Sequence, residues 1–197
     1  MLPQFVRPRL AANVESCRNV FRRRLSIRPL DPFDSTSGFK AGDPAAQPLK
    51  SFFQKQAQEF HQHSIAKTYV AEGATGDAAE KLLGFITLIA SEIDIRGGYV
   101  VDDPAHANRY ASLPAVKLAR LAVDSRFRGC RIGEALVDFS LAVVVGNVTP
   151  HIGCRFLVTD AKQPAVAFYE KMGFTLLDTD DNRERENPVM FIDLLKC

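Results

Sequence analysis

The hydrophobic pattern of the chain changes repeatedly between a period of two residues and a period near 3.6. Runs rich in β-branched and aromatic residues, bounded by glycine, proline or charged turns, predict strands. These runs cover residues 26–30, 66–72, 81–94, 115–123, 154–160, 174–180 and 188–195. The run at 81–94 is long and rich in β-branched residues, which is typical of a central strand.

Three other segments place their apolar residues on one face of a helix. They are 48–63, 132–146 and 163–173. In the first segment Phe52 and Phe60 lie on the apolar face, and a single amphipathic helix is predicted. In the last segment Pro164 suits the first helical turn, and Gly173 is placed to end the helix.

The order strand, loop, helix, strand over residues 115–160 is a βαβ crossover. Such a connection makes the strands 115–123 and 154–160 run parallel, and the two are expected to be neighbours. The remaining strands are joined by shorter loops, including an exposed charged turn at 181–186, and are expected to pair antiparallel. The predicted fold is therefore α+β, with a mixed sheet, one parallel pair and helices on both faces.

Composition narrows the class of protein. The 197 residues are 46% hydrophobic and 24% charged, which suits one globular domain, here expected over 26–197. The longest apolar run, 141–146, is far shorter than the ~20 residues of a membrane span. The four cysteines are scattered without metal-ligand spacing, so we expect free thiols in a reducing cytoplasm and no metal.

The net charge of +2 is distributed unevenly. Residues 1–30 hold seven arginines and one acid, whereas residues 31–197 hold 18 basic and 22 acidic side chains. Segment 1–25 is basic and interrupted by prolines, and it lacks the continuous apolar core of a secretory signal. It is interpreted as a flexible basic arm, an organelle presequence or upstream sequence outside the natural protein, and the fold is expected to begin near Ser26.

The stretch "RFRGCRIGEAL", residues 126–136, leads from a basic, glycine-containing loop into a helix. The first amides of a helix lack intrahelical partners, and the helix dipole adds partial positive charge at the same point. Gly129 and Gly133 allow a close approach to the backbone, so an anion such as a phosphate could bind here. A capped loop with solvent-facing arginines is the alternative.

Together with "AVAFYEKMGF" at 165–174, the segment "RLAVDSRFRGCRIGEAL" at 120–136 resembles the two signature segments of the GNAT superfamily of acetyl-CoA-dependent N-acetyltransferases. In that family the amides of an R/Q-x-x-G-x-G/A loop hold the CoA pyrophosphate. A later helix carries a tyrosine near the thioester sulfur. The resemblance extends over the order of elements from about Ser26 to Lys196 and implies the GNAT fold.

The resemblance also implies a set of site residues. The pyrophosphate loop corresponds to Arg128, Gly129, Cys130, Arg131, Ile132 and Gly133, the strand edge that splays to hold pantetheine corresponds to Leu121, Ala122 and Val123, and Phe168 accompanies the general acid Tyr169. Acetyl-CoA is the implied co-substrate, with direct attack of an amine on the thioester. The alternative for Tyr169 is a helix-face aromatic residue that packs beside Phe168.

Arg131 departs from the family pattern, because the first motif glycine usually stands at its position. If the backbone there has a negative φ, its amide stays usable and its guanidinium could contact phosphate. If the position needs a positive φ, the arginine costs roughly 1 kcal/mol.

Other polar residues near this loop have weaker candidate roles. Asp124 follows the strand and could act as a general base, but an aspartate in this place is more often a cap. Cys130 has no paired histidine and is not expected to be a nucleophile. His61 and His63 are interpreted as surface residues.

The opening third of the chain looks like that of toxin-type GNATs, in which a "FDCG…LNxFLxxQA" stretch precedes a "TYV" strand. That likeness implies the α-amine of aminoacyl-tRNA as acceptor, a small DNA-binding antitoxin as partner and a homodimer. The negative charge of residues 31–197 argues against a large phosphate-binding surface. A small-molecule or protein amine as acceptor, a non-catalytic CoA-binding module and a basic-armed RNA-binding protein remain alternatives.

Overall fold

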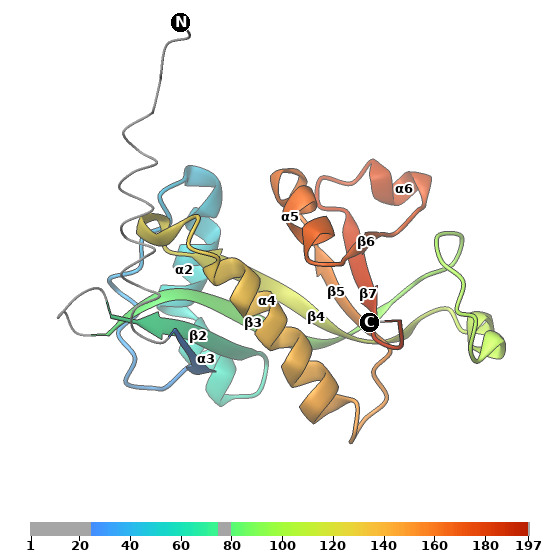
Figure 1. Ribbon diagram of the computed structural model, residues 1–197, viewed down its shortest axis with the longest axis horizontal. Coiled ribbons are helices and arrows are strands. Elements are labelled where there is room, and N and C mark those ends of the chain that lie inside the picture. Colours follow the sequence, from blue (N-terminus) through green and yellow to red (C-terminus); the bar gives the residue numbers. More distant parts are fainter. Residues whose placement is uncertain (1–24, 75–79, 197) are drawn as a thin grey trace, which may run out of the picture. The chain divides into compact units, whose positions relative to one another are not determined.

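The computed structural model describes residues 25–74 and 80–196. Strands in this part of the chain form one mixed sheet in the order β1-β2-β3-β4-β5-β7-β6 (Figure 1). Their bounds are β1 (Ser26–Pro29), β2 (Lys67–Gly73), β3 (Lys81–Ile93), β4 (Leu113–Val123), β5 (Phe156–Asp160), β6 (Thr175–Leu176) and β7 (Val189–Asp193). β4 and β5 pair in parallel, whereas β1–β2, β5–β7 and β6–β7 pair antiparallel. The mixed α+β fold with one parallel pair is confirmed.

The α-helices that the structure describes are α2 (Gln47–Lys55), α3 (Ala57–Gln62), α4 (Ile132–Val143), α5 (Val166–Lys171) and α6 (Asp180–Arg183). The prediction of a single helix over 48–63 is wrong, because Gln56 leaves the helical region at φ −128° and separates α2 from α3. The apolar spacing continues through the break, and Phe52 still contacts Phe60 with ring centroids 5.7 Å apart. Hydrophobic periodicity therefore carries no sign of the interruption.

The segment 181–186 is also different from its prediction as an exposed turn, because it begins inside α6. Thr179 caps this helix by accepting a hydrogen bond from the Asn182 amide. The Asn182 side chain is buried, donates to the carbonyls of Leu177 and Val189 at 2.9 and 3.0 Å, and accepts from the Val189 amide. The buried side chain of Asn182 thus satisfies backbone groups of Leu177 and Val189, between β6 and β7. The pattern of charged residues over 181–186 gives no indication of this role.

The described residues divide into two compact units, the first formed by 25–74, 80–87 and 120–136 and the second by 88–119 and 137–196. The described part of the first unit has an apolar core under α2 and α3, made of Leu30, Phe39, Phe52, Phe53, Ala57, Val70 and Phe85. The Phe53 and Phe85 rings stack with centroids 4.2 Å apart. This core supports the loops that precede α2 and follow β4.

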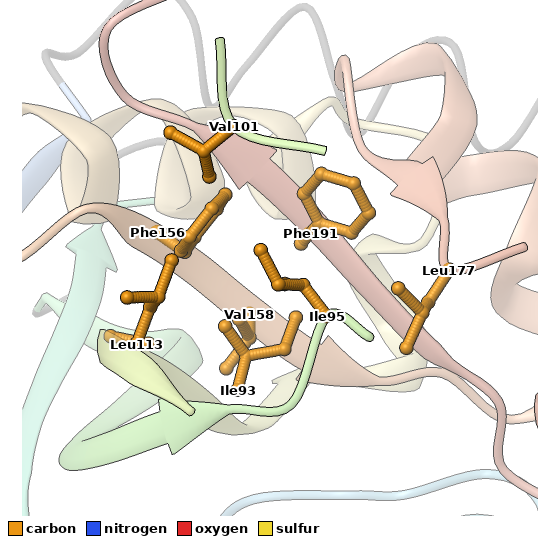
Figure 2. Packing of buried hydrophobic residues seen from close by; sticks show 9 residues of the cluster. Ile93, Ile95, Val101, Leu113, Phe156, Val158, Leu177 and Phe191 are labelled. Carbon is orange, nitrogen blue, oxygen red and sulfur yellow. The ribbon is translucent and has the colours of Figure 1, made fainter. Parts of the chain in front are cut away.

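The second unit has its own apolar core on one face of β5 and β7 (Figure 2). Phe156 and Val158 of β5 point into it together with Phe191 of β7, and the Phe156 and Phe191 rings meet edge to face. Ile93, Ile95 and other apolar residues from 93–115 cover them. In the described ranges, no helix is both long and apolar enough to cross a membrane.

Candidate functional site

The turn that follows β4 is built around the carboxylate of Asp124. This side chain is fully buried and accepts hydrogen bonds from the amides of Lys40 and Arg126 at 2.9 and 3.0 Å. Burial alone would raise the pKa of Asp124, but the bonds from Arg126 and Lys40 outweigh it and hold the pKa below its ordinary value. Asp124 is therefore an ionised cap with occupied acceptors, which favours the cap over the general base.

The three arginines of the loop differ in how far their charge is neutralised. Arg126 donates to Asp124 at 2.7 Å, and Arg131 lies 3.2 Å from Glu134 with a side chain that is 71% exposed. Arg128 donates to the carbonyl of Ala41 at 2.8 Å and has no carboxylate partner among the described residues. Arg128 thus retains an unneutralised positive charge beside the start of α4.

The backbone of this loop presents amide groups at the N-terminus of α4. Gly129 and Arg131 both have positive φ angles, +82° and +58°. Within the described ranges, the amides of Arg131, Ile132 and Gly133 donate to no other protein group. Because α4 is 12 residues long, its dipole adds to these free donors. The arrangement is that of an anion-binding helix start.

The state of Cys130 differs from the expectation of free thiols. Cys130 is buried and disulfide-bonded, whereas Cys154 is a free cysteine. The expectation of free thiols is therefore wrong for Cys130. Sequence spacing contains no information on which distant cysteines a fold brings together, so the pattern could not indicate this bond.

A cavity of about 180 Å³ lies in the first unit at the C-terminal end of β4. Four of the residues predicted to bind the cofactor line it, namely Leu121, Ala122, Val123 and Arg128. The opposite wall consists of residues that sequence reasoning did not select, namely Phe39, Ala41, Ala46 and Leu49. Phe39 and Ala41 belong to a loop rich in glycine, proline and aspartate, which has no periodic signal, whereas Ala46 ends a short 3-10 helix and Leu49 lies on α2. Periodicity predicts the helix at Leu49 but not that it faces the end of β4.

This wall is tied to the loop after β4 by backbone contacts. The Ser125 amide donates to the Lys40 carbonyl at 2.8 Å, and the Arg126 guanidinium donates to the Gly38 carbonyl at 3.0 Å. Gly42 has a φ of +71°, and a Cβ there would come within 2.3 Å of the Ser125 Cβ. Only glycine permits this close approach, so the two loops form one support for the cavity.

A second cavity in the same unit, about 440 Å³, is lined by charged, polar and apolar residues of 28–39 and 72–82 together with Arg126. Its central cation, Arg28, bonds both Asp34 and Glu72 at 2.7 Å. Because these charges are satisfied internally, we do not assign a ligand to this cavity.

Arg120 on β4 is a second cation of the first unit without an acidic partner in the described part of the chain. Its guanidinium lies over the Phe52 ring, 3.8 Å from the centroid. Burial lowers its pKa, so the environment does not compensate the charge. Cation–π stacking holds the group in place without neutralising it.

Tyr169 lies in the second unit, on α5. Its side chain is 7% exposed and packs edge-on against Phe168 and Phe174, each with ring centroids 5.2 Å away. Burial raises the pKa of Tyr169 to about 12, and a hydrogen bond with the Thr159 side chain acts in the opposite direction. In the described ranges, no three His, Cys, Asp or Glu side chains gather as a metal site.

Comparison with known proteins places this geometry in context. The family model described as an acetyltransferase (GNAT) domain matches residues 64–176. No curated protein matches the sequence at a significant level.

Three solved structures are similar over most of the chain. A tyrosine-to-phenylalanine mutant of KacT has a TM-score of 0.73 and 26% identity, covering 88% of this chain and 96% of its own. AtaT complexed with acetyl-methionyl-tRNAfMet has a TM-score of 0.72 and 24% identity, with the same coverage. A mutant AtaT toxin bound to the C-terminus of the antitoxin AtaR has a TM-score of 0.67 and 22% identity, covering 87% of this chain and 94% of its own.

Proposed function

Because the chain belongs to the acetyltransferase (GNAT) domain family, we propose that it is a toxin-type enzyme whose acceptor is the α-amine of aminoacyl-tRNA. The N-acetyltransferase activity and the use of acetyl-CoA follow from the family. The acceptor and the role of each residue are the proposal. The observation that carries the residue roles is the loop at 128–133, whose free amides begin a 12-residue helix beside an unneutralised arginine. The acceptor is supported by the likeness to AtaT complexed with acetyl-methionyl-tRNAfMet.

The loop is assigned to the pyrophosphate of acetyl-CoA. The amides of Arg131, Ile132 and Gly133 would donate to its oxygens, and Arg128 would add positive charge. Gly129 and Cys130 shape the turn that presents these amides. Leu121, Ala122 and Val123, which line the cavity at the end of β4, are assigned to the pantetheine arm.

Tyr169 is assigned as the general acid, with Phe168 packed beside it. The neutral amine nitrogen attacks the thioester carbonyl carbon, and the carbon–sulfur bond then breaks. The departing thiolate takes the proton of the Tyr169 hydroxyl, while the new amide nitrogen loses one proton to water. Water then returns a proton to Tyr169, so the proton lost by the amine equals the proton gained by CoA.

The acceptor is supported by AtaT, which is similar over 88% of this chain and is complexed with acetyl-methionyl-tRNAfMet. Arg120 supports it independently, because a positioned cation without an acidic partner in the described residues suits a phosphate group. The complex of AtaT with AtaR supports an antitoxin as partner of this chain. The family resemblance adds a homodimer to the proposal.

The test uses the full chain with labelled acetyl-CoA and a panel of charged tRNAs, deacylated tRNA, polyamines and peptides. We expect label on charged tRNA and none on deacylated tRNA. Tyr169→Phe should lower kcat about 10²-fold or more, as loss of a general acid does. Tyr110→Phe, an exposed tyrosine, is the matched control and should keep full activity.

Two results would contradict the proposal. If label appeared only on polyamines or peptides, the acceptor would be one of those amines and not aminoacyl-tRNA. Full activity of Tyr169→Phe would remove the general acid assigned here and favour the alternative that Tyr169 only packs beside Phe168.

A further inference from the structure

Arg120 on β4 is a partly buried cation whose hydrogen-bond donors are unused. A guanidinium carries five N–H groups and stays charged at any working pH. Within the described chain, the Arg120 side chain donates to no protein group, and its guanidinium contacts the Phe52 ring instead, 3.8 Å from the centroid. Because Arg120 is only partly exposed, water replaces the missing partners incompletely.

Other arginines of the first unit have acidic partners. Arg28 lies 2.7 Å from Glu72, and Arg126 lies 2.7 Å from Asp124. The hydrogen bond with Asp124 raises the pKa of Arg126, whereas burial lowers the pKa of Arg120. An unpaired charge away from water is costly, so an anion that reached Arg120 would be bound favourably.

The Phe52 ring holds the guanidinium in one place. Phe52 lies on α2, is 3% exposed and belongs to the apolar core of the first unit, where Phe60 meets it edge-on with centroids 5.7 Å apart. Stacking on the ring uses the flat face of the guanidinium and leaves the N–H groups at its edge free. An arginine with a fixed plane and free edges can donate two parallel hydrogen bonds to phosphate oxygens.

Arg120 also lies next to the cavity at the C-terminal end of β4. Residues two apart share one face of a strand, so Arg120 is on the face of Ala122, which lines the cavity. Residues three apart share one face of a helix, so Phe52 is on the face of Leu49, which lines the cavity as well. Arg120 is therefore one step of about 7 Å further along β4, in the direction away from the loop at 128–133.

This direction decides which anion can reach Arg120. In the proposed function the phosphates of acetyl-CoA bind the loop at 128–133, and the pantetheine arm lies along 121–123. The arm and the thioester are uncharged, so acetyl-CoA brings no anion to the far side of the cavity, where the acceptor meets the thioester. In aminoacyl-tRNA the carboxyl group is esterified, and the anion nearest to the amine is the phosphate that links the last two nucleotides.

We propose that Arg120 is a specificity-determining residue that binds this phosphate and so holds the aminoacyl end of tRNA at the thioester. The inference rests on the proposed function and adds the residue that distinguishes a nucleotide-linked amine from a free one. The guanidinium donates to two phosphate oxygens while Phe52 keeps its plane fixed. An amine without a phosphate gains nothing from Arg120.

The test uses the full chain with acetyl-CoA and three acceptors that carry the amino acid labelled in the tRNA panel: charged tRNA, the aminoacyl ester of the dinucleotide cytidylyl-adenosine and that of adenosine. The dinucleotide contains the phosphate, and adenosine lacks it. The unsubstituted protein should prefer the dinucleotide ester in kcat/KM by about tenfold or more, the value of a hydrogen bond to a charged group. Arg120→Gln should remove this preference and raise the KM for charged tRNA by a similar factor. A preference that survives in Arg120→Gln overturns the inference.

Two other arginine variants are the controls. Arg96→Gln removes an exposed arginine of the second unit, which pairs with Asp94, and should change neither the preference nor the KM for acetyl-CoA. Arg128→Gln should raise the KM for acetyl-CoA and keep the preference for the dinucleotide ester. Loss of the preference in either control would show a general effect of charge and overturn the role of Arg120.

Arg120→Met separates phosphate binding from a structural role. Methionine keeps an apolar contact with Phe52 but has no charge and no N–H group. Tm should not fall, because the variant removes an unpaired and partly buried charge, and the preference for the dinucleotide ester should be lost. A lower Tm with the preference intact would mean that the arginine only covers Phe52, which overturns the inference.

The failure of this inference differs from that of the proposed function. Label on charged tRNA together with an unchanged ester preference in Arg120→Gln overturns only the role of Arg120. If charged tRNA takes no label, the proposed acceptor is overturned and the role of Arg120 with it.

Discussion

Arg131 has a backbone conformation that glycine adopts at lower cost. Its φ of +58° lies in the left-handed region, where a Cβ crowds the following carbonyl. Its side chain is 71% exposed, and its ion pair with Glu134 at 3.2 Å is of the surface kind that contributes little. Of the two alternatives from the sequence, a negative φ or an unfavourable positive φ at Arg131, the structure has the second. The loop keeps its shape, and the unfavourable backbone conformation of Arg131 lowers the free energy of unfolding.

Arg131→Gly should therefore raise the free energy of unfolding by about 0.5–1 kcal/mol, measured by urea denaturation. The matched control is Arg131→Ala, which removes the same side chain but keeps the Cβ and hence the unfavourable φ. We expect no gain from the alanine variant. An equal gain in both variants would place the cost in the side chain and not in the backbone.

At the scale of elements, His61 joins α3 to β2. Its Nδ1 accepts a hydrogen bond from the Thr68 amide at 3.0 Å, which leaves the proton of the neutral ring on Nε2. Burial, and then the charge of Lys67, lower the pKa of His61. The interpretation of His61 as a surface residue is therefore wrong in part, because only His63 is exposed. Protonation of His61 would break the bond between the two elements.

The sign of the pH dependence follows from this lowered pKa. The folded state binds the proton less readily than the unfolded state, so the stabilisation from neutral His61 is complete above about pH 6.5 and lost as the pH falls through the lowered folded pKa. Between about pH 7.5 and pH 5, Tm should fall less for His61→Gln than for the unsubstituted protein. His63→Gln is the control and should follow the unsubstituted protein. Identical slopes in all three proteins would contradict the prediction.

The elements themselves were largely predictable, with exceptions at Gln56, around Asn182 and in the strand expected over 174–180, which covers only Thr175–Leu176. Strands and most helices follow from side-chain periodicity, which depends on residues close in sequence. The helix around Asn182 depends on contacts that no periodicity records. Asn182 is buried because β7 offers it the backbone of Val189, not because its own neighbours are apolar.

At the scale of the whole molecule, the distribution of charge bears on the acceptor. Residues 1–30 carry seven arginines, whereas residues 31–197 have more acidic than basic side chains. Three of these arginines, Arg22, Arg23 and Arg24, lie outside the described residues. Binding of a polyanion should depend on this charge, because each phosphate contact releases counterions and makes the affinity fall more steeply with salt concentration. A small uncharged amine should not.

We expect log kcat/KM for aminoacyl-tRNA to fall steeply with log salt concentration. Replacing Arg22, Arg23 and Arg24 by glutamine should reduce that slope by about 2, the contribution of three phosphate contacts. Replacing Arg96, Arg183 and Arg185 changes the net charge equally and is the control. Equal effects of both triple variants would show a response to net charge alone and contradict a role for the N-terminal arginines.

The sequence by itself determined the order of the elements, the parallel pair and the loop that begins α4. Periodicity, turn residues and the length of a crossover act over neighbouring residues, so they can be read without the fold. The tertiary structure decided which of the loop's arginines keeps its charge and which residues form the far wall of the cavity. The bonds that settle these two points join residues 84 to 88 positions apart, such as Lys40 to Asp124 and Ala41 to Arg128. A local pattern contains no record of such pairs, because only the packed chain brings them within hydrogen-bond distance.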